Sequence, residues 1–465
     1  MPTASQLEEL VDELDGERSA VAVDGLERFG DPARGAAGSL EVVVLPRSTE
    51  QVRSVVSWAR RHGIRLLPQG ANTGLVGAST PGREGGVVVV STEHLRGVPI
   101  IDPIDRTVVV PAGLRLSELN EHLEPHGLEL AIDLGADPSI GGMVATNTGG
   151  ARMLRHGDMG SHVLGVEAVI ADEECSVVDE LSVLRKDNTG LDLSHLFVGS
   201  GGALGVITRV ALEVEPIARD RACAWVAPAD APAALQALVS LEREAREWLS
   251  AYEVISRAAM VPALELVDGL RRPFGSPELP ELSALVEFEG RRGAQDALVE
   301  ALAALDSAGL ITDAVVAPPQ EVWAVRHSIS EGLRRSGTII GFDVSVPRSA
   351  LPQFLATVRP AVTDLLSRVI VADFGHWGDG GVHCSVVVPF DEPLSLTEIA
   401  ELRDLVFGLV VHDFAGSFSA EHGLGPANSA WWEPSTSPGS VQLSRAIKRL
   451  CDPLDLLGHP DLPYS

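Results

Sequence analysis

The sequence predicts an α+β protein with more than one domain, and three observations lead to this expectation. At 465 residues the chain is too long for one hydrophobic core, so about two to four domains are expected. Short apolar runs alternate with amphipathic segments, which is typical of mixed strands and helices. A stretch rich in Ala and Pro, Ala218–Asp230, marks a boundary, so we expect one domain over residues 1–217 and another over 218–465.

Composition and charge exclude several classes of function. Hydrophobic residues make up 45% of the chain and charged residues 22%, as in ordinary globular proteins. The formal net charge of −29 repels nucleic acid and anionic membranes, and no apolar run approaches the length of a membrane span. The four cysteines lie far apart, and Met1–Asp15 is unlike a targeting peptide. The sequence therefore predicts a cytoplasmic protein with reduced thiols, no nucleic-acid partner and no transmembrane segment.

The first half of the chain begins with a helix and a strand–helix–strand pattern. Its predicted elements are a helix at Ser5–Leu14, a strand at Glu41–Leu45, a helix at Glu50–His62 and a strand at Ile64–Leu67. The next loop, Pro68–Ser79, reads P-Q-G-A-N-T-G-L-V-G-A-S. Such a loop can present successive backbone N–H groups to a pyrophosphate. If the loop stood alone, a glycine-rich surface turn would be the better interpretation.

Two further segments rich in small residues follow the first loop. Asp137–Gly150 reads D-P-S-I-G-G-M-V-A-T-N-T-G-G, and Leu196–Gly205 contains G-S-G-G-A-L-G. Side chains this small usually lie against something flat or let elements pack closely. The elements predicted around these segments are strands and one helix: Val87–Ser91, Thr107–Val110, the helix Leu116–Glu124, Val166–Ala171 and Val206–Val214.

The order of the three loops resembles the PCMH-type FAD-binding domain of the vanillyl-alcohol oxidase superfamily, over about Leu40–Pro216. In that family the first loop holds the pyrophosphate, the second lies along the isoalloxazine and ribityl chain, and the third lies near the adenine. The first loop here lacks the histidine that tethers the flavin in some members, so the resemblance implies non-covalent FAD. It assigns FAD contacts to Pro68, Gln69, Gly70, Ala71, Asn72, Thr73, Gly74, Leu75, Gly77, Ser79, Gly141, Gly142, Ala145, Thr146, Asn147, Gly149, Gly150, Gly202 and Ile207.

The second half predicts a smaller α+β layer. Its elements are a strand at Ala222–Val226, a helix at Ala231–Trp248, a strand at Leu282–Glu289, a helix at Ala294–Ala308 and a strand at Ile311–Val316. This order resembles a ferredoxin-like layer that could cap a flavin. The predicted fold class is therefore α+β. It comprises a two-part PCMH-type FAD-binding domain and a ferredoxin-like α+β substrate domain with a C-terminal helical segment.

A predicted helix at Val322–Arg335 carries a candidate anion-binding residue. Arg326 and Ser330 are four residues apart and share one face of this helix. An arginine presented to a cavity can clasp a carboxylate through two parallel hydrogen bonds. The alternative is a solvated helix with a salt-bridged arginine.

Two histidines in a glycine-rich loop predict a metal site. The loop Gly375–His383, G-H-W-G-D-G-G-V-H, joins two predicted buried strands, which brings His376 and His383 close across a hairpin. Glu421 and His422 lie in another small-residue loop, A-G-S-F-S-A-E-H-G-L-G. A carboxylate with two histidines completes a three-ligand site with open positions. By itself this site could activate water for hydrolysis, but the flavin loops occupy almost half of the chain.

Together these motifs resemble the FAD-linked D-2-hydroxy-acid dehydrogenases, the group that includes D-2-hydroxyglutarate and D-lactate dehydrogenases. The sequence D-V-S-V-P at Asp343–Pro347 adds to the match. The resemblance implies oxidation of a D-2-hydroxy acid to the 2-oxo acid, with hydride passed to flavin N5 and an electron-transfer flavoprotein or quinone as acceptor. It assigns a divalent metal, expected to be zinc, to His376, His383 and Glu421. It makes His422 the general base and gives substrate contacts to Arg326, Ser330, Trp377 and Ser385.

Three departures from the family pattern concern the substrate. Gly341 stands where members acting on dicarboxylates commonly have a lysine, Ser385 replaces a frequent asparagine, and Pro426–Asn428 lacks a further lysine. The lost positive charges weaken the case for a second substrate carboxylate. The substrate is therefore predicted to be 2-hydroxyglutarate-like or lactate-like.

Two other classes of function stay open at this point. One is an FAD oxidase using oxygen, or a carbon-bond-forming flavoenzyme, on the same scaffold. The other is a non-catalytic protein that binds a metal or a flavin. The oligomeric state is open as well, with a homodimer among the candidates.

Overall fold

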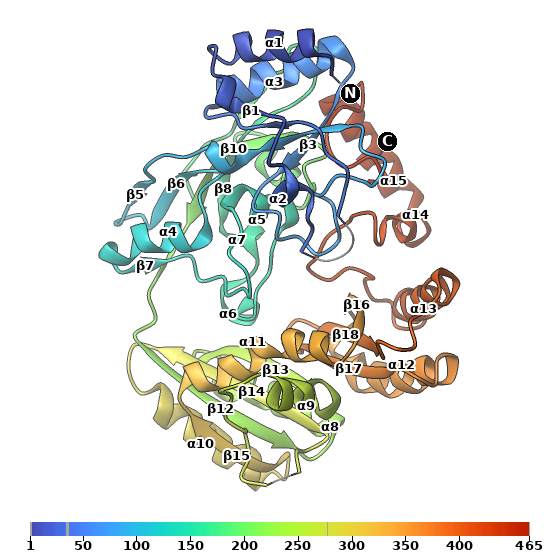
Figure 1. The fold of residues 1–465 in the computed structure, drawn as a ribbon. Helices are drawn as coiled ribbons and strands as arrows, with labels where there is room; N and C mark the ends of the chain where they lie inside the picture. The colour runs from blue at the N-terminus through green and yellow to red at the C-terminus, as the bar shows by residue number, and fades with distance from the viewer. Residues whose placement is uncertain (1, 34–36, 277, 465) are drawn as a thin grey trace. The chain divides into compact units, whose positions relative to one another are not determined.

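The computed structural model describes residues 2–33, 37–276 and 278–464, and the chain divides into two units (Figure 1). The first unit comprises Met1–Gly149, Gly157–Ile217 and Glu421–Ser465, and the second comprises Gly150–His156 and Ala218–Ala420. The chain therefore passes between the units after Gly149, His156, Ile217 and Ala420. The boundary expected near residue 217 is one of these points.

The first unit contains two main sheets. The four-stranded sheet has the order β1-β2-β4-β3, in which β2, β4 and β3 run parallel. The five-stranded sheet, β5-β6-β10-β8-β9, is antiparallel throughout. Their strands are β1 Val21–Ala22, β2 Val43–Val44, β3 Arg65–Gln69, β4 Val87–Ser91, β5 Ile100–Asp102, β6 Thr107–Pro111, β8 Val163–Val169, β9 Val177–Asp179 and β10 Val206–Glu213. One hydrophobic core contains side chains from both sheets, including Val88 and Val210, so the two sheets pack together within this unit.

Helices with clear capping signals form where the sequence predicts them. Ser48 caps α3, Thr49–His62, by accepting a hydrogen bond from the N–H of Gln51, and Gly63 ends this helix at a φ of 62°. Some helices were not predicted, among them α5, Ile140–Thr146, which lies within the second small-residue segment. The other helices of this unit are α1 Ala4–Glu13, α2 Glu27–Gly30, α4 Leu116–Leu123, α7 Met159–His162, α14 Trp432–Ser435 and α15 Pro438–Cys451, and a small sheet pairs β7 Leu128–Glu129 with β11 Glu215–Pro216.

The C-terminal segment borders β3 in the first unit. The N–H of Leu66 donates to the carbonyl oxygen of Leu456 (2.7 Å), and the N–H of Gly458 donates to the carbonyl oxygen of Leu66 (3.0 Å). A parallel bridge also joins Leu66 and Leu457. Because β3 is an edge strand, these residues extend the four-stranded sheet.

The second unit is built on a seven-stranded antiparallel sheet with the order β15-β12-β14-β13-β17-β18-β16. Its strands are β12 Asp220–Pro228, β13 Leu249–Ser256, β14 Leu282–Gly290, β15 Ile311–Ala317, β16 Thr338–Ser345, β17 Ile370–His376 and β18 Gly381–Val388. The helix predicted at Ala231–Trp248 ends earlier, at Glu244, and the unpredicted strand β13 follows it at the centre of the sheet.

Helices cover both faces of this sheet. α9 and α11 pack against each other on one face together with the short α6, whereas α8, α10 and α12 pack on the other. These helices are α6 Met153–His156, α8 Ala231–Glu244, α9 Arg257–Leu266, α10 Ala294–Ser307, α11 Pro319–Ser336 and α12 Leu351–Leu365, followed in the chain by α13 Leu396–Gly408. Because both faces are covered, the central strands are buried along almost their whole length.

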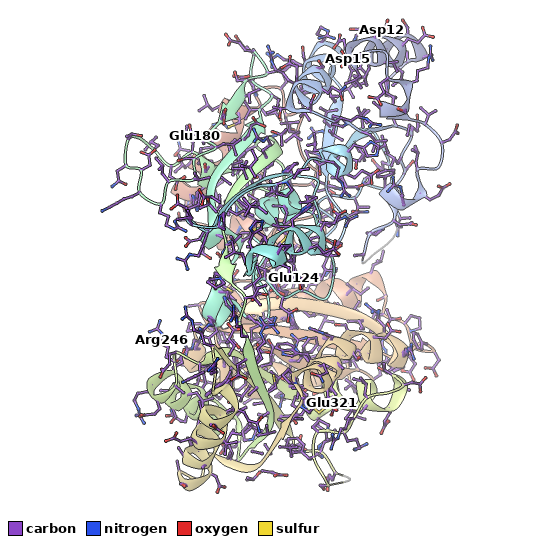
Figure 2. All side chains as sticks on the ribbon, turned by 90° about the vertical axis from the view of Figure 1, so that its left-hand side faces the viewer. Asp12, Asp15, Glu124, Glu180, Arg246 and Glu321 are labelled. Carbon is purple, nitrogen blue, oxygen red and sulfur yellow. The ribbon has the colours of Figure 1, made fainter. Side chains whose placement is uncertain are left out.

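Charged side chains lie on the surface of both units. Figure 2 labels Asp12, Glu124 and Glu180 in the first unit and Arg246 in the second, and all four are exposed. The net charge of −29 is therefore not confined to one tail. Among the described residues, no helix is both long and apolar enough to cross a membrane.

Candidate active site

The three glycine-rich loops of the first unit meet one another. A Cβ atom placed on Gly70 of the first loop would collide with the hydroxyl oxygen of Ser139, at the start of the second. In the third loop, Gly202 adopts a φ of 76°, and a Cβ there would lie 3.3 Å from Cβ of Pro68. Glycine therefore lets Ser139 approach the backbone of the first loop and lets the Pro68 side chain approach the backbone of the third.

Backbone hydrogen bonds join the second loop to the third. The N–H of Gly199 donates to the carbonyl oxygen of Val144 (2.9 Å), and that of Gly201 donates to Ala145 (2.7 Å). Asn147, at a φ of 49°, accepts a hydrogen bond from a further backbone N–H through Oδ1 (2.7 Å). The segments expected to contact the flavin thus lie together within one unit.

Two side chains of the first loop set its shape. Gln69 is buried, and its Nε2 donates to the carbonyl oxygens of Phe29 (2.9 Å) and Ser79 (2.6 Å). Asn72 lies at a φ of 54°, and its Oδ1 accepts from the hydroxyls of Ser79 and Thr80 at 3.1 Å. Both amide groups are engaged by the protein, so the loop offers mainly its backbone to a ligand.

The backbone of the first loop fits a pyrophosphate. Within the part of the chain that the structure describes, no backbone N–H from residue 70 to 79 donates a hydrogen bond to the protein. The Ser139 hydroxyl is buried between Gly70 and Gly142 and also has no hydrogen-bond partner there. A buried hydroxyl without a partner is rare, so Ser139 together with the partly exposed N–H groups of the loop fits a ligand rich in acceptor oxygens, as FAD is.

Three other predicted FAD contacts have different surroundings. Ile207 lies on β10 in the hydrophobic core and is only 5% exposed. The Thr146 hydroxyl donates to the carbonyl oxygen of Gly142 (2.9 Å), inside α5. Gly150 belongs to the second unit, whereas Gly149 belongs to the first.

In the second unit, each predicted metal-binding histidine turns Nδ1 toward a buried carboxylate. His376 lies opposite Glu253 in the β17–β13 pair, and its Nδ1 contacts Oε1 of Glu253. His383 lies opposite Asp343 in the β18–β16 pair, with its Nδ1 3.4 Å from Oδ1 of Asp343. The two imidazole rings are 5.3 Å apart between centroids, as the predicted hairpin requires. A carboxylate beside a ring nitrogen favours the tautomer with the hydrogen on that nitrogen, which would leave Nε2 of both rings for a metal.

Potential metal ligands stand on both sides of the point where the chain leaves Ala420. In the second unit, the carboxylate of Asp343 lies beside the imidazole of His383. The N–H of Ala420 donates to the carbonyl oxygen of Asp343 (3.1 Å), and Glu421 and His422 follow as the first residues of the next stretch of the first unit. A mixed set of carboxylates and imidazoles fits a divalent metal. His376 is held by Glu253.

Arg326 of α11 is fixed at one edge of its guanidinium group and open at the other. Its Nε donates to Oε2 of Glu253, and its guanidinium carbon lies 4.9 Å from the centroid of the Phe374 ring. Within the described chain its two terminal nitrogens donate to no protein acceptor, and the Ser330 hydroxyl has no hydrogen-bond partner. The side chain of Arg326 is only 11% exposed, unlike an arginine on a solvated helix face. Two parallel donors are therefore available for a carboxylate.

Glu253 joins these groups, and sequence reasoning missed it. Burial raises the pKa of this carboxyl, but the Arg326 guanidinium and the His376 imidazole beside it outweigh burial and hold its pKa well below the usual range. The signal that could have found it is a single carboxylate inside an apolar strand, L-S-A-Y-E-V-I-S. Such a charge must find partners when both faces of the sheet are covered.

The remaining predicted substrate contacts lie in the protein interior. Trp377 is 1% exposed and Ser385 is 8% exposed. Ser385 is paired with Gly341 across β18 and β16, so two of the departures from the family pattern are neighbours. In the third, Pro426–Asn428, the side chain of Asn428 holds its own loop: its Nδ2 donates to the carbonyl oxygen of Gly423, and its Oδ1 accepts from a backbone N–H, both at 3.0 Å.

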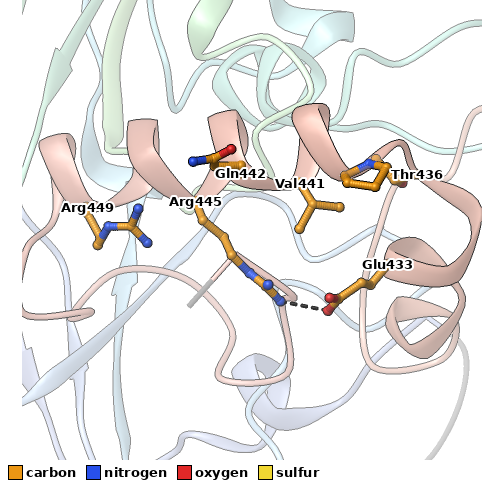
Figure 3. Close-up of a pocket in the computed structure, with 7 residues that line it drawn as sticks. Glu433, Thr436, Val441, Gln442, Arg445 and Arg449 are labelled. Atoms are coloured by element: carbon orange, nitrogen blue, oxygen red, sulfur yellow. Dashed lines mark hydrogen bonds and ion pairs between the residues drawn. The ribbon is translucent and has the colours of Figure 1, made fainter.

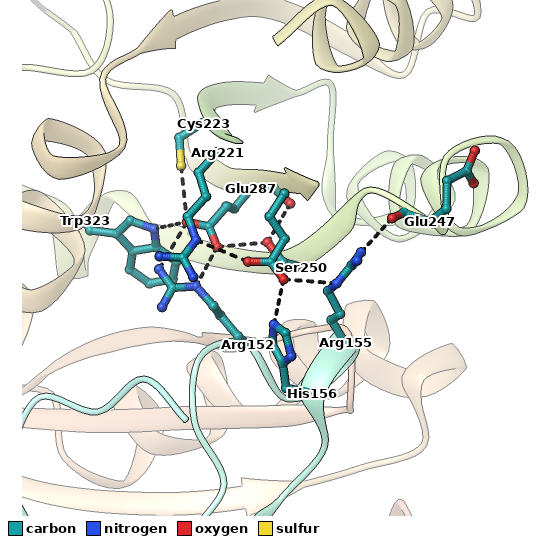
Figure 4. Close-up of polar contacts among 10 residues, drawn as sticks. Arg152, Arg155, His156, Arg221, Cys223, Glu247, Ser250, Glu287 and Trp323 are labelled. Carbon is teal, nitrogen blue, oxygen red and sulfur yellow. Dashed lines mark hydrogen bonds and ion pairs between the residues drawn. The ribbon is translucent and has the colours of Figure 1, made fainter. Parts of the chain in front are cut away.

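A second buried network holds Gly150–His156 on the sheet of the second unit (Figure 4). Nε of Arg152 and Nε1 of Trp323 both donate to the carboxylate of Glu287, at 2.6 and 2.7 Å. His156 lies 2.7 Å from the carboxylate of Glu289. The segment directly follows the second glycine-rich loop, and its place in the second unit was not predicted.

The first unit also has a pocket of about 360 Å³ beside α15 (Figure 3). One of its walls is formed by Arg445, which donates to Glu433 at 2.8 Å. The residues that line this pocket include none of the predicted site residues. We therefore assign it no part in the candidate active site.

Comparisons with known proteins also indicate FAD-dependent chemistry. The family described as "FAD binding domain" matches residues 40–179, and the family described as "FAD linked oxidases, C-terminal domain" matches residues 217–459. The mitochondrial D-2-hydroxyglutarate dehydrogenase of Arabidopsis thaliana is 34% identical over 448 residues, covering 92% of this chain and 76% of the relative. The enzyme of the same name from Bos taurus is 34% identical over 446 residues, covering 94% of this chain and 78% of the relative.

Solved structures share the fold. A crystal structure of p-cresol methylhydroxylase with substrate bound matches with a TM-score of 0.76 and 15% identity, covering 97% of this chain and 96% of that one. This likeness confirms the PCMH-type fold class. The family predicted from the motifs is confirmed as well, because the C-terminal match alone spans more than half of the chain. The chain belongs to the FAD-linked oxidoreductases that join an FAD-binding domain to an FAD-linked oxidase C-terminal domain, the family of the D-2-hydroxyglutarate dehydrogenases.

Proposed function

We propose that this protein oxidises a D-2-hydroxy acid to the corresponding 2-oxo acid. The observation that carries the proposal is its 34% identity with D-2-hydroxyglutarate dehydrogenases over 92% and 94% of the chain. In this reaction the carbon bearing the hydroxyl loses a hydride, and the hydroxyl loses a proton. When bound, FAD would accept the hydride and a divalent metal would lower the pKa of the hydroxyl.

The chain's own residues bind and orient the substrate and take its proton. Arg326 offers the substrate carboxylate its two terminal nitrogens, with the Ser330 hydroxyl one turn further along α11. His422 takes the hydroxyl proton at a ring nitrogen, as a general base. The residues that would hold the metal are His376, His383 and Glu421, with Asp343 beside His383.

The proposal favours a lactate-like substrate over a 2-hydroxyglutarate-like one. Gly341, Ser385 and the segment Pro426–Asn428 depart from the family pattern, and none of them supplies a cation. A second substrate carboxylate would need such a partner, because an unpaired charge is costly to desolvate. Both substrates belong in the test.

The metal, the acceptor and the compartment are also proposals. We propose zinc as the metal and an electron-transfer flavoprotein or quinone as the electron acceptor. The relatives named above are described as mitochondrial, whereas the sequence predicts a cytoplasmic protein. Metal analysis of the purified protein tests the identity of the metal, and fractionation of the source cells tests the compartment.

The test of the function is anaerobic mixing with the D and L forms of lactate, malate and 2-hydroxyglutarate while flavin absorbance is followed. We expect the flavin to be bleached by at least one D form and by none of the L forms. The variant His422→Asn should retain flavin and metal but lose about 10²–10⁴-fold in the rate of reduction, as expected for a general base. A colourless wild-type protein, or flavin that no D-2-hydroxy acid reduces, would refute the proposal.

A further inference from the structure

Glu253 connects the residue expected to bind the substrate carboxylate with a residue expected to bind the metal. Its Oε2 accepts from Nε of Arg326, and its Oε1 contacts Nδ1 of His376. The Glu253 side chain is fully buried. A single carboxylate therefore fixes two groups that belong to different elements, α11 and β17.

The sheet accounts for this arrangement. The register of β13 on β17 sets Glu253 directly opposite His376, so both side chains lie on the same face. α11 covers this face and carries Arg326. The other buried glutamates of this face, Glu287 and Glu289, bind the segment that contains Arg152 and His156 instead.

For Arg326, the contact with Glu253 decides which nitrogens are free. The guanidinium group is planar; Glu253 occupies Nε, and the guanidinium carbon lies over the Phe374 ring, 4.9 Å from its centroid. Only the two terminal nitrogens then remain for a carboxylate. Holding this orientation beforehand removes part of the entropy cost of binding.

For His376, the contact with Glu253 decides which ring nitrogen can bind a metal. A carboxylate beside Nδ1 favours the tautomer with the hydrogen on that nitrogen, in which Nε2 keeps its lone pair. Carboxylates behind metal-binding histidines fix the tautomer and the ring orientation in this way.

We propose that Glu253 is a positioning residue that prepares Arg326 for the substrate carboxylate and His376 for the metal at the same time. It acts through these two side chains and touches neither ligand itself. The inference rests on the proposed function and adds a residue outside the predicted site.

The first arm of the test measures metal affinity without any turnover. Flavin-loaded full-length protein is stripped of metal and titrated with Zn²⁺ against a chromogenic chelator. Glu253→Gln keeps the shape of the side chain, but its amide has one acceptor atom and one donor atom, so it cannot accept from both partners. We expect a loss of about 10–100-fold in Zn²⁺ affinity. The control is Glu287→Gln, an equally buried and arginine-paired glutamate on the next strand, which should leave the affinity unchanged.

The second arm measures recognition of the carboxylate. Glu253→Gln should raise KM for the D-2-hydroxy acid by about 10–100-fold through the loosened Arg326. The same substitution in an Arg326→Met background should raise KM no further, because residues that act as a unit are not additive. The D-2-hydroxy amide, which lacks the carboxylate, should show no KM change between wild type and Glu253→Gln.

Each outcome decides one point. If Glu253→Gln matches Glu287→Gln in Zn²⁺ affinity and in KM, the positioning role is refuted. If Glu253→Gln and Glu287→Gln lower the unfolding temperature by a similar amount, but only Glu253→Gln also loses Zn²⁺ affinity and raises KM, the result supports positioning over a general loss of structure. If the wild type oxidises no 2-hydroxy acid, the proposed function fails. The Zn²⁺ titration then still decides whether Glu253 prepares His376.

Discussion

At the scale of single residues, the second unit depends on three buried glutamates. The side chains of Glu253 and Glu287 are fully buried and that of Glu289 is 2% exposed, all on the sheet face that α11 covers. An isolated buried carboxylate would be very unfavourable, but each of the three is paired with at least one arginine. These pairs tie α11 and the segment 150–156 to the sheet.

Glu289 gives the stability of the second unit a definite dependence on pH. Burial raises the pKa of this carboxyl, but the hydrogen bond and charge of His156 and the charges of Arg221 and Arg155 lower it from 4.5 to about 2. The folded pKa is below the unfolded one, so Glu289 stabilises the fold above about pH 4.5. This contribution disappears as the pH falls toward 2. At about 1.36 kcal/mol per pKa unit, it amounts to roughly 3 kcal/mol.

Urea unfolding of wild type and Glu289→Gln at several pH values measures this contribution. We expect the difference in unfolding free energy to be largest near neutral pH and to shrink steadily below about pH 4.5. Glu300→Gln, an exposed residue on α10, serves as the control and should differ from wild type by less than about 0.5 kcal/mol at every pH. A Glu289→Gln difference that stays constant with pH would contradict the assignment.

At the scale of elements, the position of α11 depends on its close packing with α9. A Cβ atom on Gly332 of α11 would lie 2.5 Å from Cα of Ala263 and 2.6 Å from the carbonyl carbon of Pro262, both on the backbone of α9. Only glycine permits this approach. The same helix carries Arg326 and Ser330, so its distance from α9 also sets the place of the proposed carboxylate clamp.

Gly332→Ala should therefore force the two helices apart. We expect a loss of about 1–3 kcal/mol in unfolding free energy and a higher KM for the hydroxy acid, because overpacking moves the backbone. Gly408→Ala, at the end of α13, is the matched control because a Cβ there meets nothing within 4 Å. It should leave KM unchanged and stability equal or slightly higher, since alanine favours the helix. Equal thermal shifts in the two variants would argue against the close packing.

The same elements show how far the sequence could predict this fold and site. Local signals were sufficient for α3, with its Ser48 cap and Gly63 terminus, and for the hairpin that brings His376 and His383 together. The predicted end of α8, Trp248, lies beyond its actual end at Glu244. No side-chain cap marks Glu244, and the following sequence R-E-W consists of helix-compatible residues. The partners of Glu253 come from strands and helices far along the chain. No local pattern contains that pairing, because it depends on sheet order.

At the scale of the whole molecule, neither unit is a continuous stretch of chain. The first unit needs its C-terminal segment, and the buried Lys448 shows why. Its Nζ donates to Asp452 (2.6 Å) and to the carbonyl oxygens of Leu457 (2.9 Å) and Ala203 (3.0 Å). Ala203 belongs to the third glycine-rich loop, and Leu457 borders β3. One lysine thus links a candidate flavin loop to the C-terminal residues that extend β3.

A fragment that ends at Ile217 should therefore not form a stable first unit, although it contains all three glycine-rich loops. It lacks α15, Lys448 and the residues that extend β3, and an uncovered edge strand and unpaired loop carbonyls favour aggregation. We expect no cooperative urea transition and no retained FAD. The control is the same fragment joined by a flexible Gly/Ser linker to residues 421–465, which restores these contacts and should show both properties. Cooperative unfolding of residues 1–217 alone, with FAD bound, would show that the C-terminal segment is dispensable and that the first unit is complete before the chain enters the second.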